Sequence, residues 1–255
     1  MRRGLDLVAP LALIAVLLAL WEAGCRLADT PVYLLPPPSL VAKALLANLP
    51  LLVVSAWNTF AMALIALAVA SASACIIALA AALSGAFERA VRPLAVALQV
   101  TPVVALAPLI QNWAGIDHPK VAVVALTVVV AFFPIYSGAV AGLTSADRDL
   151  ERLFDLYGAS PWQRLTRLRM PSAVPFLLEG HKVAVGLALV GAVVAEFAAG
   201  SGGDQGLAWR ILEAGNHLQT DKMMAALVVL ALMGGALHAL FQQLERRALV
   251  WWRGR

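Results

Sequence analysis

Charged residues are scarce in this sequence: they make up only 13% of its 255 residues, against about 25% in an average soluble domain. Hydrophobic residues instead make up 62% of the chain, and the mean hydropathy is +0.84. A soluble domain of this size could not bury so much apolar surface, whereas a lipid bilayer offers an apolar solvent for it. The composition therefore excludes an ordinary soluble domain and predicts a protein embedded in a membrane.

Cysteine pairs, histidine clusters and nucleotide motifs are also lacking. The two cysteines, Cys25 and Cys75, lie in separate apolar stretches, so neither a disulfide framework nor a metal site is predicted. The four histidines are scattered, and no Ser/His/Asp or Cys/His constellation marks a membrane enzyme. The Gly-rich stretch 200–206 lacks the Gly-Lys-Ser/Thr ending of a phosphate-binding loop. We therefore expect no catalytic site, no metal and no cofactor in this chain.

What the sequence has instead is a series of apolar stretches, each long enough to cross a bilayer, which takes about 20 residues. The six stretches are 7–27, 56–84, 91–113, 119–143, 176–199 and 222–245. The second has small residues at four-residue intervals from Ala66 to Ala74, a spacing that lets helices approach closely in lipid. The third contains Pro93, Pro102 and Pro108, which should kink it. The sequence predicts an all-α, multi-pass protein with residues 1–255 as a single transmembrane domain.

The net charge of +4 could point to nucleic acid, but the basic residues are segregated along the chain as membrane topology requires. With the N-terminus in the cytoplasm, the inner segments hold thirteen Lys and Arg residues and the outer ones five. We therefore expect both termini to be cytoplasmic and no nucleic-acid partner. On the outer side, a short helix should begin with Ser39 as N-cap and end before Pro50, and the stretch 200–206 should form a loop.

The only long polar stretch, residues 144–175, falls on the cytoplasmic side. The sequence from Thr144 to Asp147 fits a capping box that opens a helix, and Gly158 should end that helix in the left-handed conformation. Ser160 and Pro161 should start a second helix, which Pro171 ends. Two short amphipathic helices of this kind need a partner surface. Spacing alone leaves open whether that partner is the chain's own bundle, the lipid headgroups or another protein.

A resemblance bears on this choice. The sequences YGASPWQRL at 157–165 and LRMPSAVP at 168–175 resemble the EAA loop of ABC importer permeases. Further stretches resemble the nitrate/sulfonate/taurine-type subfamily, so that the similarity covers roughly 36–240. These stretches are RPL at 92–94, TP at 101–102, APLI at 107–110, WAGI at 113–116, AFFPI at 131–135 and VVAEF at 193–197.

The resemblance implies a type I ABC importer permease fold in the cell inner membrane, with ATP hydrolysis in a separate subunit. It implies a second copy of this chain, cytoplasmic ABC ATPase subunits and a periplasmic or extracellular solute-binding protein as partners. In such permeases the loop forms a coupling helix that sits in a groove of the ATPase. The positions expected to couple to the ATPase are Glu151, Arg152, Leu153, Phe154, Tyr157, Gly158, Ala159, Ser160, Trp162, Arg164 and Pro171.

The sequence departs from the family pattern at the Glu-Ala-Ala positions themselves. These three residues would fall at Arg152, Leu153 and Phe154, and the acidic residue is Glu151, one place earlier. Because Gly158 and Pro171 are kept, we expect docking to survive with an altered contact.

Polar residues within membrane helices usually face the interior of the bundle, so they are candidates for the translocation path. These candidates are Gln99, Thr101, Pro102, Gln111, Asn112 and Glu196. The resemblance suggests nitrate, a sulfonate such as taurine, or a small heterocycle of the vitamin-precursor class as the solute. The alternative is an ATP-independent secondary transporter, which would predict ion sites within the spans and inverted repeats. No clear repeat is visible in the sequence.

Overall fold

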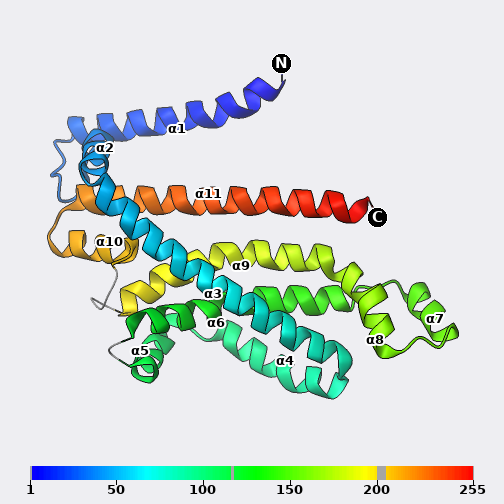
Figure 1. Ribbon diagram of the computed structural model, residues 1–255. Helices are drawn as coiled ribbons and strands as arrows, with labels where there is room; N and C mark the ends of the chain where they lie inside the picture. Colours follow the sequence, from blue (N-terminus) through cyan, green and yellow to red (C-terminus); the bar gives the residue numbers. More distant parts are fainter. Residues whose placement is uncertain (1, 116–117, 200–204, 255) are drawn as a thin grey trace. The chain divides into compact units, whose positions relative to one another are not determined.

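The computed structural model describes residues 2–115, 118–199 and 205–254, and every element in this part of the chain is helical (Figure 1). The prediction of an all-α protein is therefore confirmed. The helices are α1 (Arg2–Leu27), α2 (Pro38–Ala47), α3 (Leu49–Leu83), α4 (Gly85–Val100), α5 (Val103–Ala114), α6 (Pro119–Leu143), α7 (Arg148–Leu156), α8 (Pro161–Arg164), the π-helical segment η1 (Leu165–Arg169), α9 (Met170–Ala199), α10 (Leu207–Asn216) and α11 (Thr220–Arg253).

Among the described residues, five helical stretches are long and apolar enough to cross a membrane: α1, α3, α6, the run from α8 to α9, and α11. The helices α4 and α5 provide a sixth span if they count as one, but they meet at 105°. The third predicted span, 91–113, is thus two helices rather than one kinked rod. Pro102 accounts for the break, because it holds the preceding Thr101 in an extended conformation with ψ of 124°.

The described helices form two compact units: residues 1–57 with 205–231, and residues 58–204 with 232–255. In the first unit, Glu22 of α1 accepts hydrogen bonds from the backbone N–H (2.9 Å) and the hydroxyl (2.8 Å) of Ser39. The prediction that Ser39 caps α2 was wrong, because Pro37 is the N-cap and Ser39 lies in the first turn. Its polar groups instead tie α2 to α1.

The same unit contains a helix, α10, that the sequence analysis did not predict. Leu207 and Ala208 of this helix are fully buried, and Arg210 donates a hydrogen bond to Ser55 of α3 at 3.2 Å. The predicted Gly-rich outer loop falls largely on residues 200–204, which lie outside the described residues, as do Ile116 of WAGI and the following Asp117.

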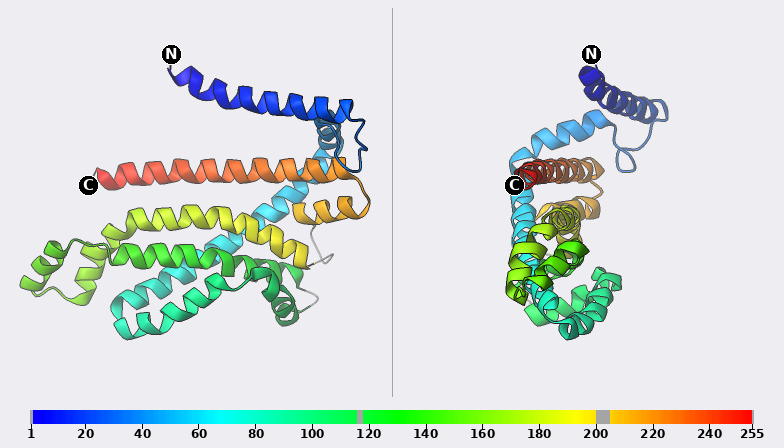
Figure 2. Two further views of the ribbon diagram at one scale, coloured as in Figure 1. Left: turned by 180° about the vertical axis from the view of Figure 1, so that it is seen from behind. Right: turned by 90° about the vertical axis from the view of Figure 1, so that its right-hand side faces the viewer.

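In the second unit, α6 and α9 lie side by side (Figures 1 and 2). Glycines bring the two backbones almost into contact. A Cβ atom on Gly138 would lie 2.7 Å from the carbonyl oxygen of Phe176, and one on Gly180 would lie 2.6 Å from that of Pro134. Lipid tails are as apolar as the helices, so no hydrophobic effect drives the helices together in a membrane. Close packing through small residues is the usual basis of their association there. This contact builds the scaffold of the second unit.

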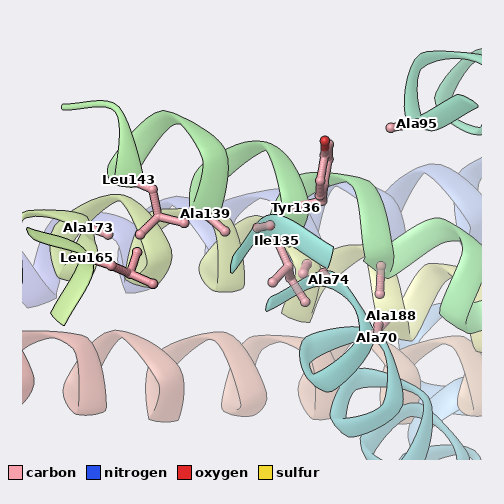
Figure 3. Close-up of a cluster of buried hydrophobic side chains, with 13 residues drawn as sticks. Ala70, Ala74, Ala95, Ile135, Tyr136, Ala139, Leu143, Leu165, Ala173 and Ala188 are labelled. Atoms are coloured by element: carbon pink, nitrogen blue, oxygen red, sulfur yellow. The ribbon is translucent and has the colours of Figure 1, made fainter. Parts of the chain in front are cut away.

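The alanines of α3 pack into the same core. Ala66, Ala70 and Ala74 are fully buried, as the predicted small-residue spacing requires. Figure 3 shows Ile135 of α6 pointing toward Ala74, whereas the neighbouring Tyr136 leaves α6 in another direction. α6 therefore uses one side for the α3 and α9 core and has a second side available for α4.

Candidate functional site

The predicted coupling loop forms a helical hairpin beyond the ends of α6 and α9 (Figures 1 and 2). Its first helix, α7, is capped by Asp147, whose carboxylate accepts hydrogen bonds from the backbone N–H groups of Asp149 (2.7 Å) and Leu150 (3.3 Å). The predicted capping box at Thr144 was wrong. α6 continues to Leu143, and the Thr144 hydroxyl bonds back to the Val140 carbonyl at 2.9 Å.

The turn between the two helices matches the sequence prediction closely. Gly158 has a φ of +60°, the left-handed conformation that only glycine adopts at little cost. Ser160 then caps α8 by accepting from the Gln163 N–H at 3.2 Å, and the Gln163 side chain accepts from the Ser160 N–H at 2.8 Å. Pro161 occupies the first turn, where its missing N–H is harmless. The direction of the second helix is therefore set by local chemistry.

A shared carboxylate braces the hairpin. Glu151 of α7 accepts hydrogen bonds from Arg164 at the end of α8 (3.3 Å) and from Arg169 of η1 (2.8 Å). Arg164 also pairs with Asp155. The Glu151 and Arg164 side chains are only 22% and 23% exposed, so water screens this pair less than a fully exposed one. The acidic residue that departs from the family pattern by one place thus joins α7 to the helix that follows.

The three positions that align with the family's Glu-Ala-Ala lie on α7 in different environments. Arg152 is exposed and pairs with Asp149, which is also exposed, at 3.1 Å. Leu153 is exposed and Phe154 is half-buried.

Large apolar side chains surround the turn and are open to solvent. Leu156 is 85% exposed, Tyr157 83% and Trp162 64%, and Ala159 lies half-buried between them in the sequence. Side chains of this size rarely remain so exposed together unless a partner covers them. The hairpin is therefore a projection braced by ion pairs, with an apolar tip.

Pro171 does not end the second helix, contrary to the sequence prediction. α8 continues through η1 into α9, so one helical rod joins the hairpin to the fifth predicted span. In η1 the Met170 N–H bonds to the Leu165 carbonyl, five residues back. This wider turn comes just before Pro171, which has no N–H to continue the regular pattern. The Pro171 carbonyl accepts a hydrogen bond from the Trp252 indole of α11 at 2.9 Å.

The candidate path residue Glu196 lies near the other end of this rod. From Met170 it is 26 residues along α9, or roughly 39 Å at 1.5 Å per residue. The carboxylate is buried, at 6% exposure, and accepts a hydrogen bond from the Thr59 hydroxyl of α3 at 2.7 Å. α5 packs nearby, because its Ala107 shares a cluster with Ala195 of α9.

The remaining candidate path residues are not gathered into one polar cluster. Gln99 is exposed on α4, and the Thr101 hydroxyl bonds back to the Ala97 carbonyl at 2.7 Å. Pro102 forms the bend itself. On α5, Gln111 has a buried amide nitrogen without a partner among the described residues, whereas Asn112 is exposed.

Sequence reasoning missed a hollow of about 250 Å³ between α4 and α6. Its lining includes Glu88 and Arg92 of α4 and Phe133, Tyr136 and Ser137 of α6. None of these residues was selected as a site candidate from the sequence, because Arg92 was used only for topology and the resemblance, and Phe133 only for the resemblance.

Comparison with known proteins decides the family. Residues 72–250 match the model of the family described as "binding-protein-dependent transport system inner membrane component". The chain belongs to this family. It is therefore a multi-pass membrane protein and a permease component of ABC-type transport systems for small solutes, as the resemblance implied.

Individual relatives of this permease cover nearly its whole length. It is 33% identical over 252 residues to the formylaminopyrimidine transport permease protein ThiX of Halalkalibacterium halodurans, covering 98% of both chains. It is 36% identical over 256 residues to the riboflavin transport system permease protein RibX of Chloroflexus aurantiacus, covering 92% of this chain and 87% of the relative. The taurine transport system permease protein TauC of Escherichia coli is 28% identical over 246 residues, covering 93% and 87%.

Proposed function

We propose that this permease is the non-catalytic transmembrane subunit of an ATP-driven importer, and that its α7–α8 hairpin docks into a cytoplasmic ATPase subunit. The observation that carries the proposal is the hairpin itself: a projection braced through Glu151, with Leu156, Tyr157 and Trp162 exposed around its turn. Burying a large apolar side chain contributes about 1.5–3 kcal/mol. A groove that covered these three side chains would therefore hold the hairpin firmly.

The hairpin is connected to the membrane bundle so that a push on it is passed on rather than absorbed. The helical rod continues from α8 through η1 into α9, and α9 packs closely on α6 through glycines. Lys182 of α9 pairs with Glu245 of α11 at 3.3 Å, and Trp252 of α11 bonds to Pro171. ATP-driven closure of the ATPase would then move α9 and α11 together, and the far end of α9 carries Glu196.

The proposal includes the partners and the placement of the permease. Two copies of this chain would line the path, with Gln99, Thr101, Pro102, Gln111, Asn112 and Glu196 as the proposed contributors. The hairpin and both termini would face the cytoplasm across the cell inner membrane. A solute-binding protein would deliver the solute from the other side.

For the solute, the relatives named for formylaminopyrimidine, riboflavin and taurine support a heterocycle of the vitamin-precursor class or a sulfonate. Nitrate was a further expectation from the subfamily resemblance. We propose a small solute from this range, delivered by the binding protein.

The test is ATP hydrolysis by the assembled system in liposomes. This permease would be reconstituted with the ATPase and binding protein encoded beside it, and pyrimidines, flavins, taurine, other sulfonates and nitrate would be added one at a time. We expect one ligand to stimulate hydrolysis only when the binding protein is present. If no stable complex with the ATPase forms, the docking proposal fails, and uptake driven by an ion gradient without ATP becomes the function to measure.

A further inference from the structure

The hollow between α4 and α6 has the composition of a binding site rather than of a packing defect. Tyr136 lies on its wall and is only 5% exposed, and Glu88, Arg92 and Ser137 line it as well. Among the described residues, none of these four side chains has a hydrogen-bond or ion-pair partner. Tyr136 is buried, Glu88 is half-buried, and Arg92 and Ser137 are exposed, so the polar edge of the hollow is open and a ligand can reach it. The hollow therefore offers hydrogen-bonding groups that the protein itself does not use.

Its aromatic wall is held in place. The ring of Phe132 stacks on that of Tyr136, with centroids 5.6 Å apart and planes 9° from parallel, and Phe133 lines the hollow beside them. Figure 3 shows the Tyr136 oxygen pointing away from the core cluster around Ile135. Aromatic surfaces with a fixed orientation favour flat ligands, because stacking needs a planar partner.

The charges of the hollow argue against a simple anion. Arg92 lines it together with Glu88, so one positive charge is balanced by one negative charge. Arg169 lies in an adjoining hollow that also contains Glu88, but Glu151 already pairs with it at 2.8 Å. A sulfonate or nitrate would have to compete with Glu88 and Glu151 for the guanidinium groups of Arg92 and Arg169. A neutral molecule with both donors and acceptors could instead bind Glu88 and Arg92 at once.

We propose that this hollow is a solute-binding site of the permease for a neutral, planar nitrogen heterocycle, with Tyr136 and Phe133 against the ring and Glu88, Arg92 and Ser137 on its polar edge. This inference rests on the proposed import function and narrows its substrate class. It also places the contact with the solute on α4 and α6, away from Glu196.

The first test is solute uptake by the complete reconstituted complex, with an aminopyrimidine and an alkanesulfonate as probes. Tyr136→Phe removes one hydroxyl and keeps the ring, so we expect aminopyrimidine uptake to fall by roughly two- to tenfold, the usual size of one lost hydrogen bond. Tyr33→Phe is the matched control, because Tyr33 is 62% exposed and lies in the other unit. It should leave uptake unchanged, and ATPase recovery should be unchanged in both variants.

Binding at the hollow can be measured separately from transport. Ser137→Cys places a thiol at its exposed edge, and labelling by a water-soluble thiol reagent should be slowed several-fold by the aminopyrimidine and not by the alkanesulfonate. The parent chain, with Cys25 and Cys75, gives the background labelling. A thiol that is unreactive in the complete complex would mean that another chain covers the hollow, and this outcome would overturn the proposal.

The Glu88→Gln variant tests the charge argument, because it leaves Arg92 without its balancing charge. We expect aminopyrimidine uptake to fall several-fold and the alkanesulfonate to gain protection of Ser137→Cys. If the complex forms and only the alkanesulfonate stimulates hydrolysis in the parent, the heterocycle site is wrong while the importer proposal stands. If no ATPase complex forms, the importer proposal itself fails.

Discussion

Two of the breaks between helices in the second unit, at Gly158 and at Thr101–Pro102, are built differently. At Gly158 the chain turns through a glycine in the left-handed conformation, with a capping box after it and Glu151 joining the helices on either side. At Thr101–Pro102 the chain turns by 105° because proline cannot continue the helix, and Pro102 caps α5 without a side-chain hydrogen bond. In the described residues no side-chain hydrogen bond joins α4 to α5.

The difference indicates that the two breaks serve different purposes. A hairpin that is capped and cross-linked by ion pairs moves as one body, so it can pass on a displacement. At the bend, α5 packs against α6 and α9 through apolar residues such as Ala107, which can slide, and no ion pair among the described residues fixes the angle between α4 and α5. We infer that the α7–α8 hairpin moves as a rigid body during transport, and that the angle between α4 and α5 changes.

Replacing Gly158 should have the largest effect on the hairpin. A β-branched residue disfavours the left-handed conformation by more than the roughly 1–2 kcal/mol that applies to L-residues in general. Gly158→Val should therefore misdirect α8 and abolish uptake, measured in liposomes with the ATPase present, while membrane insertion stays normal. Gly186→Val is the matched control, because a Cβ atom on this helical glycine meets nothing within 4 Å. Near-normal uptake by Gly158→Val would refute the rigid-hairpin argument.

Removing the brace should have the next largest effect. Glu151→Gln loses the charge that holds both Arg164 and Arg169, so α7 and α8 should move more independently. We expect several-fold less solute uptake per ATP hydrolysed. Solute uptake and ATP hydrolysis would be measured in the same liposomes. Asp149→Asn is the control, since Asp149 is 86% exposed and, among the described residues, its carboxylate pairs only with Arg152. If Glu151→Gln and Asp149→Asn take up the same amount of solute per ATP hydrolysed, the ion pairs of Glu151 have no part in passing movement from the ATPase to the membrane helices.

The local features of the hairpin could be predicted because a few adjacent residues determine them. Gly158 permits one unusual φ angle, and Ser160 with Pro161 caps a helix through groups within one turn. The same reasoning failed at Pro171, because a π-helical turn absorbs the missing N–H and α9 continues. It also failed at Thr144, since whether a residue starts one helix or ends another depends on how far α6 extends.

The α4–α6 hollow could not be predicted in this way. Arg92 and Tyr136 are far apart in the sequence, and only the bend at Pro102 and the packing of α6 bring their helices together. The close contact of α6 with α9 depends likewise on Gly138 and Gly180 facing each other across the two helices. Periodicity marks a small residue but does not identify the helix that it meets.

Straightening the bend between α4 and α5 should have a moderate effect on solute uptake and no effect on binding of the ATPase. Pro102→Ala restores an N–H and frees Thr101 to become helical, so α4 and α5 should sample a more open angle. Spin labels at the exposed Leu94 and Leu109 should then report a longer and broader distance, with uptake lowered a few-fold and ATPase recovery unchanged. Pro93→Ala, inside α4, is the control and should leave the distance unchanged. A distance that is unchanged in Pro102→Ala would mean that packing, not proline, sets the bend.

The smallest effect is expected at the position where the family's glutamate would fall. Arg152→Glu restores that residue type, yet Arg152 is 77% exposed and its one ion pair, with Asp149, is of the exposed kind worth at most about 1 kcal/mol. Because Glu151 already supplies the carboxylate that binds Arg164 and Arg169, we expect uptake and ATPase recovery to change by less than about twofold. The double variant Glu151→Gln/Arg152→Glu tests whether the acidic residue acts through the ATPase or within the hairpin. If it regains the coupling that Glu151→Gln loses, the acidic residue acts by docking to the ATPase from either position, whereas continued loss means that it acts within the hairpin.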